Sequence, residues 1–268
     1  MGSMETVTSR DGTPIAYERS GDGPPLVLVH GTTSDHLTWE LVQPELQKHF
    51  TVYAIDRRGR GESGSGDGSA YDIEREFEDV VAVIDSIDGT VGLLGHSYGA
   101  ICALEGALRS SRVGGLVLYE GTFPVSEGTE LYPPEALDSV QSSLKAGDRE
   151  GALTIFYHDI ALISPEEIEM LRSLPIWAAR VTLAPAIPQE MRAFESYVSN
   201  FDPARLGNLR TPTLLLLGGD SPPLERAAAE TLDAALPDSR IAVMRDQQPQ
   251  SGKRADLSVY PVQARRRQ

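Results

Sequence analysis

Three short apolar runs, each ending at a glycine or a glycine-rich turn, constrain the fold of this chain more than any other feature. They read PPLVLVHG at 24–31, VGLLGHS at 91–97 and TPTLLLLGGD at 211–220. A continuous apolar run is typical of a strand buried on both faces, as strands are inside a parallel sheet. Such a sheet needs helices on both of its faces, because either face left bare would expose apolar side chains to water.

Strand and helix patterns alternate at short intervals along the rest of the chain. Residues 71–87, for example, carry apolar side chains at helical spacing among acidic ones, which predicts an amphipathic helix. Strands are expected at 13–21, 24–31, 52–55, 91–97, 113–121, 211–218 and 239–244, and helices at 71–87, 98–110 and 223–236. This alternation predicts an α/β fold with a mostly parallel central sheet and flanking helices.

The middle of the chain interrupts this alternation. Residues 122–205 are rich in proline, show helical spacing and contain no clear strand pattern. We therefore predict that residues 1–121 and 206–268 form one α/β core. Residues 122–205 are predicted to form a helical insertion that covers the core as a lid.

The stretch Gly95-His96-Ser97-Tyr98-Gly99 lies between a predicted strand and a predicted helix. It fits the pattern G-x-S-x-G, in which a nucleophilic serine occupies a sharp strand-to-helix turn. Glycines two residues on either side avoid Cβ collisions at such a turn. The helix that follows directs unpaired N–H groups toward a developing oxyanion. Ser97 is therefore the candidate nucleophile.

Together with this motif, three further stretches resemble the α/β-hydrolase superfamily over almost the whole chain. They are His30-Gly31 after an early strand, DRRGRGESG at 56–64 and LLLLGGD at 214–220. The resemblance implies the α/β-hydrolase fold and an oxyanion hole formed by the backbone N–H groups of Thr32 and Tyr98. It also implies hydrolysis of an ester-like bond in a small, largely apolar molecule. The sequence shows neither a metal-ligand cluster nor a dinucleotide-binding motif, so no metal or organic cofactor is expected.

The same resemblance places the acid of the catalytic triad after one of two strands. Glu120 ends the run LVLYE, 23 residues beyond Ser97, and Asp220 ends LLLLGGD. Asp220 comes one residue earlier than the usual G-x-x-D spacing, which falls on Ser221. Carboxylates at strand ends also cap helices, so the sequence leaves both candidates open.

The base of the triad is missing from its expected place. A serine hydroxyl needs a neighbouring base, and in the superfamily this is a histidine in the loop after the last strand. The five histidines of this chain are His30, His36, His49, His96 and His158. His36, on a loop at the expected active end of the sheet, is the first candidate for a substitute base, and His158 in the expected lid is the second. His30 and His96 are expected to have structural roles.

The residues after Met244 depart from the superfamily in two further respects. They show no apolar helical periodicity, and they carry six lysine or arginine residues against two acidic ones in an otherwise acidic chain. A shift of reading frame near Arg245 would explain all three departures. The DNA sequence tests this hypothesis, because the alternative frame would have to encode a histidine and an amphipathic helix.

Composition limits the partners. The net charge of −15 argues against nucleic acids and anionic membrane surfaces, both of which attract cations. The first residues show no basic start followed by an apolar run, so we expect a cytoplasmic protein. The arginines of 56–68 lack the lysine pattern of a nucleotide-binding loop and are expected to form a tight turn.

Two alternatives to hydrolysis follow from the missing histidine. The chain could be a non-hydrolytic member, such as a small-molecule cyclase, lyase or binding protein, or a homologue without catalytic activity.

Overall fold

The computed structural model describes residues 2–66, 68, 71–121, 123 and 131–244, with one eight-stranded sheet at its centre. The strand order is β1-β2-β4-β3-β5-β6-β7-β8. The strands are β1 (Ser3–Thr8), β2 (Pro14–Ser20), β3 (Pro25–Val29), β4 (Thr51–Ile55), β5 (Val91–His96), β6 (Val113–Tyr119), β7 (Thr213–Gly218) and β8 (Ser239–Met244). From β4 to β8 every neighbouring pair is parallel, whereas β2 pairs antiparallel with β1 and β4. The predicted mostly parallel sheet is confirmed.

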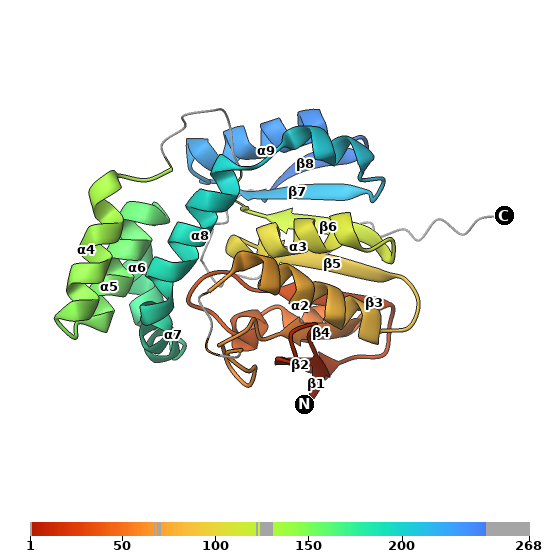
Figure 1. Ribbon diagram of the computed structural model, residues 1–268, viewed down its shortest axis with the longest axis horizontal. Coiled ribbons are helices and arrows are strands. Elements are labelled where there is room, and N and C mark those ends of the chain that lie inside the picture. Colours follow the sequence, from red (N-terminus) through yellow and green to blue (C-terminus); the bar gives the residue numbers. More distant parts are fainter. Residues whose placement is uncertain (1, 67, 69–70, 122, 124–130, 245–268) are drawn as a thin grey trace.

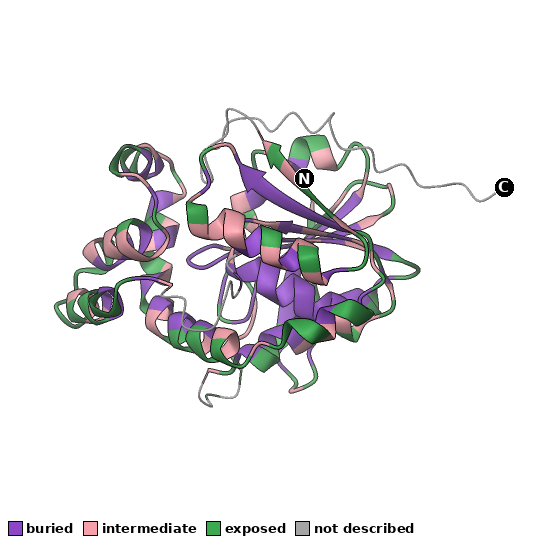
Figure 2. Ribbon diagram, turned by 90° about the horizontal axis from the view of Figure 1, so that it is seen from above, coloured by how far each residue is buried: buried purple, intermediate pink, exposed green. Residues whose placement is uncertain are grey.

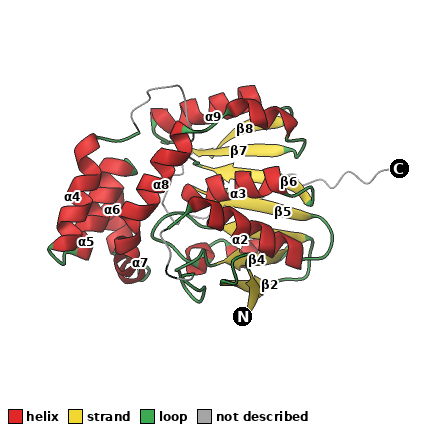
Figure 3. Cartoon of the chain, in the orientation of Figure 1, coloured by secondary structure: helices red, strands yellow, loops and turns green. Residues whose placement is uncertain are grey.

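The helices of the core lie on the faces of this sheet (Figures 1 and 3). They are α1 (Gln43–Leu46), α2 (Ile73–Ser86), α3 (Tyr98–Arg109) and α9 (Pro223–Ala235). Helices α2, α3 and α9 cover one face, and α3 is the most deeply buried of them, with ten buried residues. Such burial explains why its sequence is apolar nearly all round. The view from above shows buried residues concentrated in the sheet and the helix against it (Figure 2).

The other face of the sheet is covered near β3 and β4, where Trp39 and the α1 region pack against Leu28 and Val52. Farther along, at β8, Ile241 and Val243 are 36% and 43% exposed. The chain after Met244, where the superfamily resemblance predicts a closing helix, lies outside the described residues.

A group of helices separates β6 from β7 in the sequence. These are α4 (Pro134–Lys145), α5 (Arg149–Ile155), η2 (Phe156–Ile160), α6 (Pro165–Arg172), α7 (Trp177–Leu183), η3 (Ala184–Ala186) and α8 (Ile187–Ser199), followed by η4 (Pro203–Asn208). Figure 1 shows α4 to α7 together beside the sheet, with α8 leading back toward the core. Proline at the first turns of α4, α6 and α8 is compatible with helix starts, since the N–H groups there have no helical acceptor.

Strand β1 was not anticipated from the sequence. Its residues SMETVT are half-exposed or exposed, and they form a strand because they pair with β2 from Ser3↔Arg19 to Thr8↔Pro14. A polar edge strand of this kind carries no apolar run that would predict it.

Candidate active site

Ser97 occupies a strained turn between β5 and α3. Its backbone has φ 54° and ψ −124°, in the region that L-residues other than glycine rarely adopt. The turn is held by the Ser97 N–H, which donates to the Tyr119 carbonyl of the neighbouring strand at 2.9 Å. Strain of this kind persists only where the surroundings enforce it, and it is concentrated at functional sites.

Three glycines allow the turn to pack closely. A Cβ on Gly95 would lie 2.2 Å from the Gly99 oxygen, and a Cβ on Gly99 would lie 2.3 Å from the Val29 oxygen. A Cβ on Gly31 would meet the Ser97 Cβ at 3.0 Å and its Oγ at 3.5 Å. The end of β3 therefore lies directly against the serine turn, which brings the two glycine motifs of the sequence together.

The expected oxyanion residues lie beside Ser97. Thr32 follows β3 after Gly31, Tyr98 is the first residue of α3, and both line the same cavity as Ser97. The first N–H groups of a helix have no acceptor within the helix, which leaves the Tyr98 N–H available to a ligand. The helix dipole adds positive potential at this end.

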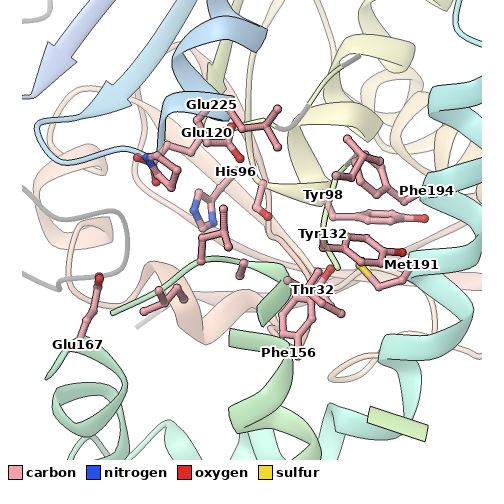
Figure 4. A pocket seen from close by; sticks show the side chains of 18 of the residues that line it. Thr32, His96, Tyr98, Glu120, Tyr132, Phe156, Glu167, Met191, Phe194 and Glu225 are labelled. Atoms are coloured by element: carbon pink, nitrogen blue, oxygen red, sulfur yellow. The ribbon is translucent and has the colours of Figure 1, made fainter. Parts of the chain in front are cut away.

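The cavity is lined by the core and by the helices inserted between β6 and β7 (Figure 4). Its volume is about 180 Å³, comparable to the ~150 Å³ cavity that holds a benzene-sized molecule. Apolar lining residues from the inserted helices include Phe156, Met191 and Phe194. Carboxylates of Glu120, Glu167, Asp220 and Glu225 also line it.

The structure brings both candidate acids to the cavity but in different environments. Glu120 is 6% exposed and has a left-handed φ of 47° at the end of β6. Its Oε1 accepts bonds from the Gly218 N–H, at 3.0 Å, and from the Ser221 hydroxyl. Burial raises the pKa of the Glu120 carboxyl above its usual value, although these two bonds oppose the rise. Asp220 is exposed.

Ser221 therefore has a defined place in the site. It occupies the position where the usual spacing would put an acid, and its hydroxyl donates to Glu120 instead.

Among the histidines of the chain, His96 is the one that the described cavity lining includes. It is packed between Tyr119 at 4.9 Å and Trp39 at 6.5 Å between ring centroids. Burial lowers the pKa of His96 to about 4, with a smaller contribution from Arg180, so its ring is neutral at neutral pH. Its buried Nε2 has no hydrogen-bond partner among the residues described.

The two candidate substitute bases are not part of the described cavity lining. His36 lies 2.8 Å from Asp56 through its Nδ1, and that bond raises the pKa of the imidazole. His158 is exposed and pairs with the adjacent Asp159 at 2.6 Å. The loop after β8, where the superfamily resemblance places the histidine, lies outside the described residues, and the chain has no histidine beyond His158.

Several lining residues had not been singled out from the sequence, among them Tyr132, Glu167, Met191, Phe194 and Glu225. Glu167, Met191 and Phe194 come from inserted helices whose amphipathic pattern predicts burial but not the surface they pack against, and their position relative to Ser97 depends on how those helices dock. Tyr132 precedes α4, and Glu225 is in the core helix α9.

No group of three or more potential metal ligands occurs among the residues described. No helix in those ranges is both long and apolar enough to cross a membrane.

Comparison with known proteins connects this geometry to a family. The model of the alpha/beta hydrolase family matches residues 26–250. The chain is 30% identical to the N-formylmaleamate deformylase of Pseudomonas putida over 230 residues, which cover 83% of this chain and 80% of that protein.

Solved structures give the same result. An alpha/beta hydrolase from Sphaerobacter thermophilus is 34% identical, with a TM-score of 0.80 over 91% of this chain and 93% of its own. The esterase RhEst1 from Rhodococcus sp. ECU1013 is 26% identical, with a TM-score of 0.70 over 91% and 90% of the two chains.

Proposed function

This chain belongs to the alpha/beta hydrolase family, and from that premise we propose that it hydrolyses an ester-like bond of a small, mainly apolar molecule through Ser97. The observation that carries the proposal is the strained turn at Ser97, open to a cavity that Thr32 and Tyr98 also line. A hydrolase relative and an esterase neighbour support the reaction class.

In the proposed reaction the Ser97 Oγ attacks the substrate carbonyl carbon and loses its proton to a base. The N–H groups of Thr32 and Tyr98 donate to the oxyanion of the tetrahedral intermediate. Collapse of the intermediate expels the alcohol, which takes up the proton and leaves an acyl-serine. Water then attacks this ester and releases the acid and the free serine.

Glu120 is the acid that we propose for the triad. Its carboxylate is buried and fixed by two bonds to Oε1, so Oε2 is the atom that would accept a bond from a base. A charged group that orients a base has to be held in one geometry, and Asp220, being exposed, lacks these restraints.

The absence of a histidine after His158 bears on the rate. We propose that the serine is acylated slowly in this chain, because general-base assistance contributes about 10²–10⁴-fold. His36 is retained as a candidate base only if substrate binding brings it to Ser97 from its present bond with Asp56.

The helices between β6 and β7 are proposed to act as the lid. Most of the apolar side chains of the lining come from this inserted segment, with Ile101, Pro222 and Leu224 added by the core. Thr32, Tyr98 and Glu120 also come from the core. A cavity of this size with four carboxylates in its lining suits a small, neutral substrate better than a long or anionic one.

A fluorophosphonate probe and p-nitrophenyl acetate test the proposal, with Ser97→Ala as the matched control. Labelling and turnover in the wild-type protein that disappear in Ser97→Ala are expected. A protein that the probe does not label, even after hours at high concentration, would contradict it.

The missing histidine favours a second candidate function. In this reading the cavity binds a small molecule, or promotes its cyclisation or elimination, without an acyl-serine. Ligand binding to the wild-type protein that Ser97→Ala leaves unchanged, together with no labelling, would support it.

A further inference from the structure

The carbonyl group of Gly31 receives two hydrogen bonds. His30 Nδ1 lies 2.8 Å and Arg57 Nη1 lies 3.1 Å from this oxygen. His30 Nε2 accepts from the Arg57 backbone N–H at 3.1 Å, so the proton of the neutral ring is on Nδ1, which donates to Gly31. Burial lowers the pKa of His30 well below its usual value, which keeps the ring neutral.

This carbonyl belongs to the peptide group whose N–H is that of Thr32, an expected oxyanion donor. Two donors on the oxygen fix the plane of the peptide. They also draw electron density from the amide, which strengthens its N–H as a donor. Arg57 also contacts the residue that carries the other expected donor, since its guanidinium carbon lies 4.4 Å from the centre of the Tyr98 ring.

The guanidinium of Arg57 is itself held by two carboxylates in the interior. Glu76 of α2 accepts bonds of 2.6 and 2.7 Å from Nε and Nη2, and Glu190 of α8 accepts one of 2.6 Å from Nη2. The side chains of all three residues are no more than 1% exposed. Because α8 belongs to the inserted helices, Arg57 bridges the proposed lid and the end of β3.

We propose that Arg57 is a positioning residue for the oxyanion hole, and that Glu190 couples this role to the docking of α8 on the core. The guanidinium orients the Gly31–Thr32 peptide with its N–H toward Ser97, and Glu190 fixes the guanidinium only when α8 is seated. The catalytic consequence rests on the proposed function, whereas the effect on the peptide does not.

Arg60 provides a matched control within the same network. Its Nη2 binds the same oxygen of Glu190 and its Nη1 donates to the Arg58 carbonyl at 2.8 Å. Its side chain is 3% exposed, yet among the described residues its bonds do not include Gly31. Replacement of Arg60 therefore disturbs the ion network without removing a donor from the peptide.

The first experiment compares the backbone resonances of Arg57→Lys and Arg60→Lys with those of the wild-type protein. A lysine keeps the positive charge beside the carboxylates, so the chain keeps its buried ion pairs, but one ammonium cannot serve both carboxylates and Gly31 as the guanidinium does. The Gly31 carbonyl ¹³C and Thr32 amide ¹⁵N signals should move upfield in Arg57→Lys and stay in place in Arg60→Lys. In Glu190→Gln both signals should move by a smaller amount.

The second experiment measures acylation of Ser97 by p-nitrophenyl acetate and by its thiono analogue, whose sulfur is a poor hydrogen-bond acceptor. In Arg57→Lys the acylation rate should fall on the order of 10-fold for the oxygen ester, with less effect on KM and on the thiono ester. Arg60→Lys should preserve the oxygen-to-sulfur ratio of the wild-type protein.

The two readouts separate the failure of this inference from the failure of the proposed function. A wild-type protein that is not acylated contradicts the proposed function, and the resonances still decide the role of Arg57. Unmoved Gly31 and Thr32 signals in Arg57→Lys, or equal movements in Arg60→Lys, would overturn the inference.

Discussion

Replacement of Gly99 by alanine tests whether the serine turn depends on the close approach of α3 to β3. The new Cβ would lie 2.3 Å from the Val29 oxygen and 2.4 Å from the His30 oxygen. Ordinary van der Waals contacts begin near 3.4 Å, so the backbones of α3 and β3 would have to separate by about 1 Å. Overpacking of this kind costs ~1–3 kcal/mol or more. Both obstacles are backbone carbonyls, which cannot rotate away as a side chain would, so the upper end of that range applies.

The intrinsic preference of a helix for alanine offsets part of this cost. Gly99 is in the first turn of α3, where the exchange contributes about 0.5–1 kcal/mol in favour of alanine. The free energy of unfolding should therefore fall by about 2–3 kcal/mol. For a chain of 268 residues, that corresponds to a decrease in Tm of about 4–5 °C.

Gly115→Ala is the matched control. Gly115 lies in β6, and an added Cβ there would meet no atom within 4 Å. The free energy of unfolding from equilibrium urea denaturation should change by less than about 1 kcal/mol, toward greater stability. If Gly99→Ala unfolds at the same urea concentration as wild type, the close packing of the serine turn described above is refuted.

Three further predictions concern the acid, the base and the pH dependence of stability. Gln248→His, in the segment outside the described residues, should raise the acylation rate on the order of 10²-fold if a histidine after β8 is all that the site lacks; an unchanged rate in stopped-flow assays would contradict this. In the Gln248→His background, Glu120→Gln should abolish the gain in acylation rate. It should also stabilise the protein at pH 7, because a raised pKa of the Glu120 carboxyl means that its buried charge costs stability above the unfolded pKa. Asp220→Asn should change neither the rate nor the stability, and the opposite pattern would identify Asp220 as the acid. Asp56 raises the pKa of His36, so their pair stabilises the fold fully below the unfolded pKa of about 6.5, and this contribution is lost as the pH rises through the folded pKa. The free energy of unfolding, measured with urea at pH 6 and at pH 9, should differ less between the two pH values in His36→Gln than in wild type. An equal difference in the two proteins would contradict the stabilising role of the His36–Asp56 pair.

The parts of the fold that could be predicted from the sequence are those whose signal is local. The runs ending at Gly31 and Ser97 predicted β3 and β5, because burial on both faces requires uninterrupted apolar residues. The turn at Ser97 could be expected because glycines at fixed offsets are needed wherever strand and helix meet so closely. Strand β1 had no such signal, since its pairing partner supplies its structure.

The sequence could not separate Glu120 from Asp220 as candidates for the acid, because each follows a strand at the same edge of the sheet. Their difference is one of environment: Glu120 is covered and bonded by Gly218 and Ser221, and Asp220 is exposed. Spacing along the chain carries no information about which carboxylate is desolvated.

The link between the inserted helices and the core is the least predictable feature and the most informative one. Arg57 and Glu190 are 133 residues apart in the sequence, and each alone is an ordinary charged residue of a turn or a helix. A buried ion pair is weak evidence of stabilisation, because removing two charges from water is costly and an apolar pair would serve as well. The guanidinium does more than pair with carboxylates, because it also donates to the Gly31 carbonyl. A neutral apolar side chain of the same volume could fill the space under α8, but it could not donate a hydrogen bond to the Gly31 carbonyl, which is the contact on which the proposed role of Arg57 depends.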